Sequence, residues 1–162
     1  MDSSAFVALA LMCAPLVNPS TTRALVAVES GFNPHAIGVV GGALMRQPSS
    51  RAEALATARA LQADNWNFSV GLAQINLHNL QRLGLSLETV FDPCLNLAGM
   101  QAVLTECSER ADPRQTDRQR SLRQALSCYY SGDFTTGFRH GYVRKVEVAA
   151  RAVPIAHPKE KT

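Results

Sequence analysis

A glutamate stands where a helix is expected to end. The stretch LVAVESGFNP, residues 25–34, finishes an apolar helical run in Glu29-Ser30-Gly31. A helix C-terminus carries partial negative charge and disfavours a carboxylate, and apolar neighbours disfavour the charged form as well. Both effects are expected to raise the pKa of Glu29 above its ordinary value of about 4.3. A carboxyl that stays protonated near neutral pH is what general-acid cleavage of a glycosidic bond requires.

Two further blocks of residues have the same character. GLAQIN at 71–76 and CYYSG at 128–132 each lie at the expected end of an element or in a turn, where functional groups are commonly displayed. Ordinary glycoside hydrolysis uses a second carboxylate across the cleft. None falls inside the three blocks, and we interpret the nearby Asp64 and Asp133 as cap or loop residues. One acid suffices if the substrate supplies its own nucleophile.

These three blocks, in this order, resemble the lytic transglycosylases of the goose-lysozyme-like and soluble-lytic-transglycosylase superfamily. More narrowly, ESGFNPHAIGVVGG, WNFSVGLAQIN, FDPCLNLAGM and CYYSGDFTTGF resemble the transglycosylases that accompany bacterial type IV secretion and conjugation systems. The resemblance extends over about residues 5–153. It implies a mainly α, lysozyme-like domain with a small β-ribbon near the active-site cleft.

The resemblance also implies a role for each matching residue. Glu29 matches the family's single catalytic acid, Gln74 a glutamine that lines the sugar cleft, and Tyr129 a tyrosine that reaches toward the acid. Gln74 and Tyr129 are expected to hold the N-acetyl group and to orient the acid. The other expected substrate-binding residues are Ser30, Asn76 and Tyr142.

The implied substrate is peptidoglycan, cleaved at the β-1,4 bond between N-acetylmuramic acid and N-acetylglucosamine with formation of a 1,6-anhydro ring. Such cleavage opens the cell wall locally for assembly of a type IV secretion or conjugation apparatus, whose subunits are expected partners. The implied compartment is the periplasm, and we expect a monomer without metal or cofactor. Two alternatives stay open: a hydrolytic lysozyme on the same fold, and a non-catalytic module that binds peptidoglycan or secretion components. Ala73 and Tyr130, where the family pattern has methionine and asparagine, keep the second alternative open.

Capping and breaker residues predict the elements that position the first two blocks. Asn18 before Pro19 predicts a helix start, and Gly31 predicts the end of that helix. Alternating apolar residues predict a short strand over 66–72, with Trp66 and Phe68 in the core rather than at the sugar cleft. GVVGG, after Glu29, is expected to be a loop. The helices predicted in this half of the chain are 4–14, 18–31, 50–64 and 74–83.

The second half of the chain is predicted to be helical with one polar break. Asp92-Pro93 opens a helix that continues to about Cys107, and the Arg-rich segment 110–120 is expected to be a solvated connection. Helices are then predicted over 121–132 and 141–153, before a frayed tail at 154–162. On the motif match we place Tyr129, rather than Tyr130, in the cleft.

Composition agrees with one globular domain. The 162 residues are 46% hydrophobic and 18% charged, and the net charge of +3 is too small to predict nucleic-acid binding. No apolar run is long enough to span a membrane. The N-terminal run carries Asp2 instead of basic residues, so we interpret it as a core helix, and no export signal is evident in it. The four histidines lack metal-ligand spacing.

Four cysteines permit two disulfides in an exported protein. None belongs to a C-x-x-C pair, which disfavours a zinc site. Cys94 and Cys107 fall at opposite ends of one predicted helix, too far apart to bridge each other. The candidate pairs are therefore Cys107 with Cys128, or either of these with Cys13.

Overall fold

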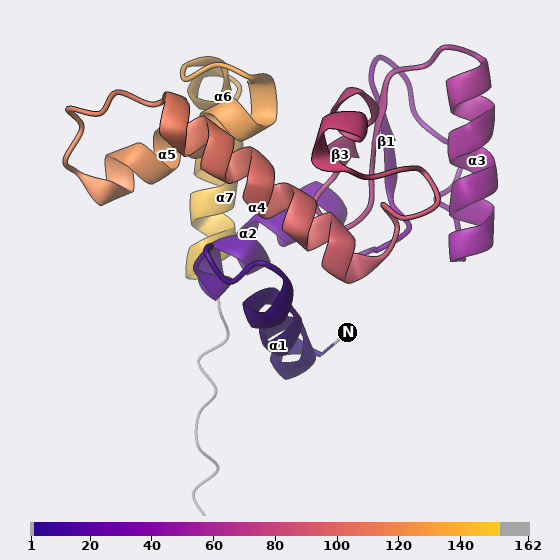
Figure 1. Cartoon of the computed structure of the whole chain (residues 1–162), viewed down its shortest axis with the longest axis horizontal. Helices are drawn as coiled ribbons and strands as arrows, with labels where there is room; N and C mark the ends of the chain where they lie inside the picture. Colours follow the sequence, from indigo (N-terminus) through magenta and orange to yellow (C-terminus); the bar gives the residue numbers. More distant parts are fainter. Residues whose placement is uncertain (1, 153–162) are drawn as a thin grey trace, which may run out of the picture.

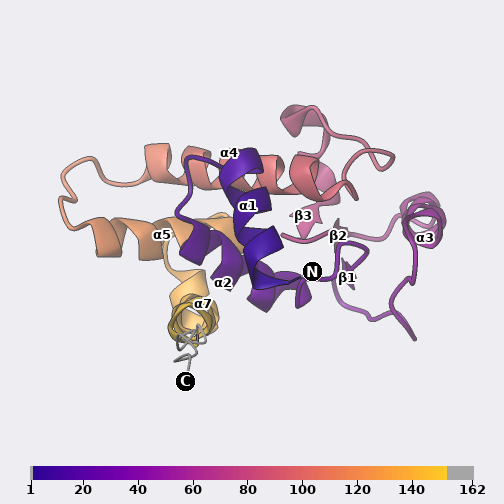
Figure 2. The same cartoon turned by 90° about the horizontal axis from the view of Figure 1, so that it is seen from below.

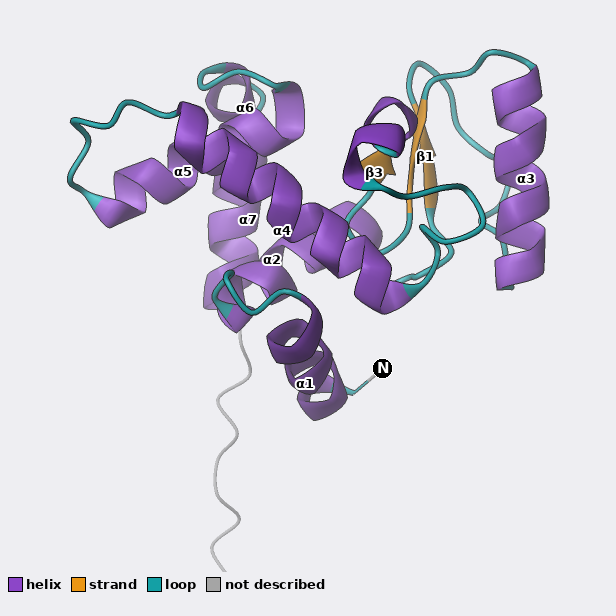
Figure 3. Cartoon of the chain, in the orientation of Figure 1, coloured by secondary structure: helices purple, strands orange, loops and turns teal. Residues whose placement is uncertain are grey.

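Helices pack around the long helix α4, and a small antiparallel sheet lies between these helices and α3 (Figures 1 and 3). The computed structural model describes residues 2–152. In chain order the elements are α1 (Ser3–Cys13), α2 (Pro19–Ser30), β1 (Ile37–Val39), α3 (Arg51–Ala63), β2 (Phe68–Val70), β3 (Ile75–Asn76), the 3₁₀ helices η1 (Leu77–Asn79) and η2 (Gln81–Leu83), α4 (Pro93–Arg110), α5 (Arg118–Ser131), α6 (Thr136–Arg139) and α7 (Tyr142–Arg151). The expectation of a mainly α fold with a small β-ribbon is confirmed. The expected tail at 154–162 lies outside the described residues.

Capping residues mark the starts of α2, α3 and α4 and the ends of α2 and α5. Asn18, Ser50 and Asp92 each accept a hydrogen bond from a backbone N–H in the first turn of α2, α3 and α4. Gly31 and Gly132 follow α2 and α5 in the left-handed conformation, which glycine adopts without steric cost. These signals act over a few residues, so they do not depend on the rest of the fold.

The predicted helix over 74–83 is wrong. Ile75 pairs with Val70 in an antiparallel register, which puts the first residues of this segment into β3. The Asn76 carboxamide then accepts a hydrogen bond from the His78 N–H and opens η1. The chain then makes two short 3₁₀ turns, η1 and η2, and Gly84 ends the second of them with a positive φ of 67°.

The sequence also missed β1 and α6. Ile37 and Val39 pair antiparallel with Val70 and Phe68, so part of the expected GVVGG loop is an edge strand. β-branched residues on either side of Gly38 favour a strand, but the glycines around them favoured a loop. The predicted strand over 66–72 contains the observed β2, which is shorter.

One prediction about the core is half wrong. Phe68 is fully buried, as expected, but Trp66 is 45% exposed. Trp66 lies before β2, directly after the turn in which Asn65 takes a positive φ of 60°, so it is not part of the alternating strand. The Trp66 ring lies over Gly42, at van der Waals distance from the position of a Cβ there.

Two disulfides join α4 to its neighbours. Cys107–Cys128 links α4 to α5 and was one of the expected pairs. Cys13–Cys94 links the end of α1 to the start of α4 and was not among them. Figure 2 shows α1 lying against α4 at this junction. Among the described residues, no helix combines the length and the apolar character that crossing a membrane needs.

Candidate active site

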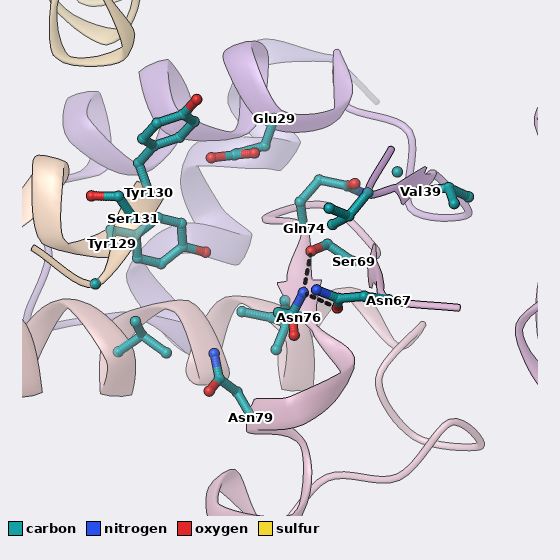
Figure 4. A pocket seen from close by; sticks show the side chains of 15 residues that line it. Glu29, Val39, Asn67, Ser69, Gln74, Asn76, Asn79, Tyr129, Tyr130 and Ser131 are labelled. Atoms are coloured by element: carbon teal, nitrogen blue, oxygen red, sulfur yellow. Dashed lines mark hydrogen bonds between the residues drawn. The ribbon is translucent and has the colours of Figure 1, made fainter. Parts of the chain in front are cut away.

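A cleft of about 480 Å³ lies between the end of α2, the sheet and the end of α5. Glu29 lies at the end of α2, Gln74 in the turn before β3, Asn76 in β3 itself, and Tyr129 in α5; all four line the cleft (Figure 4). Three segments far apart in the chain therefore bring four of the predicted site residues to one cavity. The other lining residues are Gly38, Val39, Val40, Asn67, Ser69, Ile75, Asn79, Val103, Tyr130, Ser131 and Gly132.

Glu29 is half-buried in the last turn of α2. Burial disfavours its charged form and raises the pKa of Glu29 to about 7. The Tyr142 hydroxyl donates a 2.5 Å hydrogen bond to Glu29 Oε1, which acts to lower the pKa but less strongly than burial raises it. The expected upward shift of this pKa is confirmed, and desolvation is its main cause.

The hydroxyl of Tyr142, rather than that of Tyr129, donates a hydrogen bond to the Glu29 carboxyl. The Tyr142 phenol has a pKa far above the ordinary value, first because it is buried and second because the Glu29 carboxylate disfavours a phenolate beside it. It therefore remains a donor. The Tyr129 hydroxyl instead donates to the Ala73 carbonyl at 2.6 Å, so its proton is directed at the backbone and not at Glu29. The reason is tertiary: α7 packs along α2 and brings Tyr142 to Glu29.

The Gln74 side chain is held in place by the protein backbone. Its Nε2 donates to the carbonyls of Ala36 and Gly71, at 3.1 and 3.0 Å. Its Oε1 lies against Gly38, where an added Cβ would come within 2.6 Å. Gln74 itself takes a positive φ of 51°, a conformation that costs a non-glycine residue energy and that clusters at functional sites.

A residue that sequence reasoning missed supports this turn from behind. Asn96 of α4 is fully buried, and its Nδ2 donates to the carbonyls of Val70 and Val90. Its Oδ1 accepts from the Ala73 N–H at 2.8 Å. The signal in the sequence was an asparagine among the apolar positions of LNLAGM, where a polar group needs partners of its own.

Asn76 belongs to a polar cluster on the sheet side of the cleft. Its Nδ2 donates to Asn67 Oδ1 at 2.9 Å and to Ser69 Oγ at 3.3 Å (Figure 4). Asn67 and Ser69 were not predicted as site residues, because single hydroxyl and amide groups in or beside a strand carry no sequence signal of function. Glu29 is the one carboxylate among the described residues that line the cleft.

The remaining predicted site residue points elsewhere. The Ser30 hydroxyl donates to the Val26 carbonyl of its own helix, at 3.3 Å, and Ser30 is not among the residues that line the cleft. Within residues 2–152 there is also no group of three His, Cys, Asp or Glu side chains that could hold a metal ion.

Comparison with known proteins identifies the family of this chain. Residues 7–150 match the family described as "Transglycosylase SLT domain". The chain belongs to this family. Among curated proteins, this SLT domain is 49% identical over 151 residues to the "Type IV secretion system protein virB1" of Brucella abortus (strain 2308). It is 41% identical over 153 residues to the "Protein virB1" of Agrobacterium fabrum.

These alignments cover more of the SLT domain than of its relatives. They include 90% and 91% of the present chain but 63% and 61% of the Brucella and Agrobacterium proteins. The chain thus spans less than two thirds of the length of these curated relatives. No solved structure matches the chain.

Proposed function

We propose that the protein is a peptidoglycan lytic transglycosylase, with Glu29 as the catalytic acid. It cleaves the β-1,4 bond between N-acetylmuramic acid and N-acetylglucosamine and forms the 1,6-anhydro product. One observation carries the proposal: a half-buried carboxyl with its pKa raised to about 7 faces a cleft whose described lining residues include no second carboxylate. That arrangement suits a reaction in which one group serves first as acid and then as base.

The proposed reaction balances with Glu29 alone. Protonated Glu29 gives its proton to the glycosidic oxygen, and the bond from C1 of N-acetylmuramic acid to that oxygen breaks. The resulting carboxylate accepts the proton of the 6-hydroxyl while O6 bonds to C1, so Glu29 ends protonated and no water is consumed. The Tyr142 hydrogen bond stabilises the carboxylate between these two steps.

The polar lining of the cleft would hold the sugar. Gln74, Asn76 and Tyr129 line it, and we propose that they position the N-acetyl group and the ring hydroxyls. Ser30 contributes through the helix end that carries Glu29, since its hydroxyl bonds to the helix backbone.

We also propose a setting for the reaction. The SLT family match and the virB1 names of the relatives support local opening of the cell wall during assembly of a type IV secretion or conjugation apparatus. Subunits of that apparatus are the proposed partners, and the protein acts as a monomer. The two disulfides suit the periplasm, which is an oxidising compartment.

Product analysis on purified murein sacculi tests the activity. Wild-type protein is expected to release muropeptides that end in 1,6-anhydro-N-acetylmuramic acid, detected by mass spectrometry. Glu29→Gln keeps the shape of the side chain but has no proton to give, so we expect it to fold and to lose nearly all activity.

Two results would contradict the proposal. Products with reducing ends would identify a hydrolytic lysozyme instead. Sedimentation of wild-type protein with sacculi, without any cleavage, would identify a binding module.

A further inference from the structure

Tyr130 lies in the last turn of α5, with its ring against the ring of Tyr142. The two rings are stacked, with centroids 4.6 Å apart and planes 18° apart. The hydroxyl of that same Tyr142 donates to Glu29. Tyr130 is 44% exposed, so it covers Tyr142 from the solvent side.

The outer edge of the Tyr130 ring is also fixed. Its hydroxyl lies 3.1 Å from His140 Nδ1, in the segment that leads into α7. The His140 ring meets the Tyr130 ring edge-on, with centroids 5.8 Å apart. Tyr130 is therefore held on one face by Tyr142 and at its hydroxyl by His140.

The segment between α5 and α7, which includes α6, is bonded to the end of α5 that carries Tyr130. Ser127 Oγ of α5 donates to the Asp133 carbonyl and accepts from the Gly137 N–H of α6. An added Cβ at Gly137 would lie 2.6 Å from Ser127 Cα, so the two helices touch through their backbones. These contacts tie the end of α5 to α6, which in turn packs against α7.

We propose that Tyr130 is a positioning residue for the acid: its ring, anchored by His140, holds Tyr142 in the orientation in which the phenol donates to Glu29. A hydrogen bond weakens steeply as its angle departs from linear, so a small rotation of Tyr142 loses it. Stacking on Tyr130 removes the space into which that ring would turn. The importance of this contact for turnover rests on the proposed function, but its effect on Glu29 does not.

The titration of Glu29 in NMR experiments on the intact protein tests this inference directly. Besides each other, the titratable groups that act on this pair are two tyrosines of α5: Tyr129 acts on both Glu29 and Tyr142, and Tyr130 acts on Tyr142. Tyr142→Phe removes the donor and is expected to raise the pKa of Glu29 by about 1. Tyr130→Leu removes the stacked ring and should raise the same pKa by a smaller amount.

Two further variants serve as controls. One tests the hydroxyl of Tyr130 apart from its ring, and the other tests the loss of an exposed aromatic ring elsewhere. Tyr130→Phe keeps the stack and loses only the His140 contact, so the pKa of Glu29 should rise less than in Tyr130→Leu. Phe138→Leu removes an aromatic ring that is 45% exposed on α6, and no change in the pKa of Glu29 is expected. If Tyr130→Leu does not fold, Tyr130→Gln takes its place as the non-aromatic variant.

A double variant tests whether Tyr130 acts on Glu29 through Tyr142. In a Tyr142→Phe background, Tyr130→Leu should cause no further rise in the pKa of Glu29, because the phenol through which Tyr130 acts has gone. A full additional shift in the double variant would overturn the inference, as would an unchanged pKa in Tyr130→Leu alone. These results hold whether or not the protein cleaves murein, so failure of the proposed activity is distinguishable from failure of this inference.

Discussion

Glu29 shows how a proposed catalytic requirement works against stability. A carboxyl placed in water would titrate near its ordinary pKa, whereas burial in the cleft raises the pKa of Glu29 to about 7. The native state therefore holds this proton more tightly than the unfolded state does. The same desolvation that makes a useful acid makes the folded protein less stable once the proton has gone.

That linkage predicts a stability difference with a definite sign. Between pH 4.5 and about pH 7 the native state binds more protons than the unfolded state, so the free energy of unfolding falls as pH rises. The fall contributed by Glu29 is about 3 kcal/mol over this window. Glu29→Gln removes the contribution. In urea titrations we expect the variant to gain stability over wild type by about this amount between pH 4 and pH 8.

The pH dependence of turnover follows from the same group. A general acid must be protonated at the start of the reaction, so the rate of anhydro-product release should fall about tenfold per pH unit above about pH 7. Measurement between pH 5 and pH 9, at constant ionic strength, checks this. A rate that keeps rising to pH 9 would contradict the assignment of Glu29 as the acid.

The turn from β2 to β3 is positioned by α4. Asn96 binds both sides of the turn through the Val70 carbonyl and the Ala73 N–H, and Gln74 follows directly. Gly71 has a φ of 81°, and an added Cβ would lie 2.1 Å from Asn96 Nδ2. The glycine is thus required for two reasons, its backbone conformation and the close approach of a buried side chain.

A matched pair of glycine substitutions separates these two reasons. Gly84 also has a positive φ, of 67°, but a Cβ there meets nothing within 4 Å. Gly84→Ala should cost about 1 kcal/mol, for the left-handed conformation alone. Gly71→Ala should cost about 2 kcal/mol more, because it also displaces Asn96 and unpairs buried backbone groups. Chemical denaturation measures both, and equal losses would show that Asn96 can yield without cost.

At the scale of the whole molecule, two disulfides fix α4 to its neighbours, one near each end of the helix. Cys13–Cys94 closes a long loop that includes α2, the sheet and α3, with a sequence separation of 81 residues. Cys107–Cys128 closes a shorter one of 21 residues between α4 and α5. The closed loop of the longer bridge thus contains both the helix that carries Glu29 and the β2–β3 turn that carries Gln74.

The lengths of the two closed loops predict that the two disulfides contribute differently to the free energy of unfolding. The chain-entropy model assigns about 4 to 5 kcal/mol to the longer loop and about 3 kcal/mol to the shorter one. The double variant Cys13→Ser with Cys94→Ser should therefore lose more stability than Cys107→Ser with Cys128→Ser. Thermal unfolding of both variants beside wild type, without reductant, provides the comparison. The reverse order would mean that strain or residual structure, rather than loop length, governs the bridges.

Much of the fold was readable from the sequence, because the signals involved are local. Asn18, Ser50 and Asp92 satisfy backbone groups within one turn, and Gly31 and Gly132 supply a backbone conformation at their own positions. The segment 74–83 was misread because β3 exists only by pairing with β2, and local propensity does not show that pairing.

By itself, the sequence determined the helical framework and a carboxyl at an apolar helix end, where its charged form is disfavoured, because each follows from neighbours along the chain. Only the tertiary structure decided which phenol meets that carboxyl. Tyr142 is 113 residues from Glu29, and Tyr129 turns to Ala73 instead. Such partners are chosen by how helices pack, since a side chain bonds to whatever group packing brings within 3 Å, and no spacing in the sequence encodes that choice.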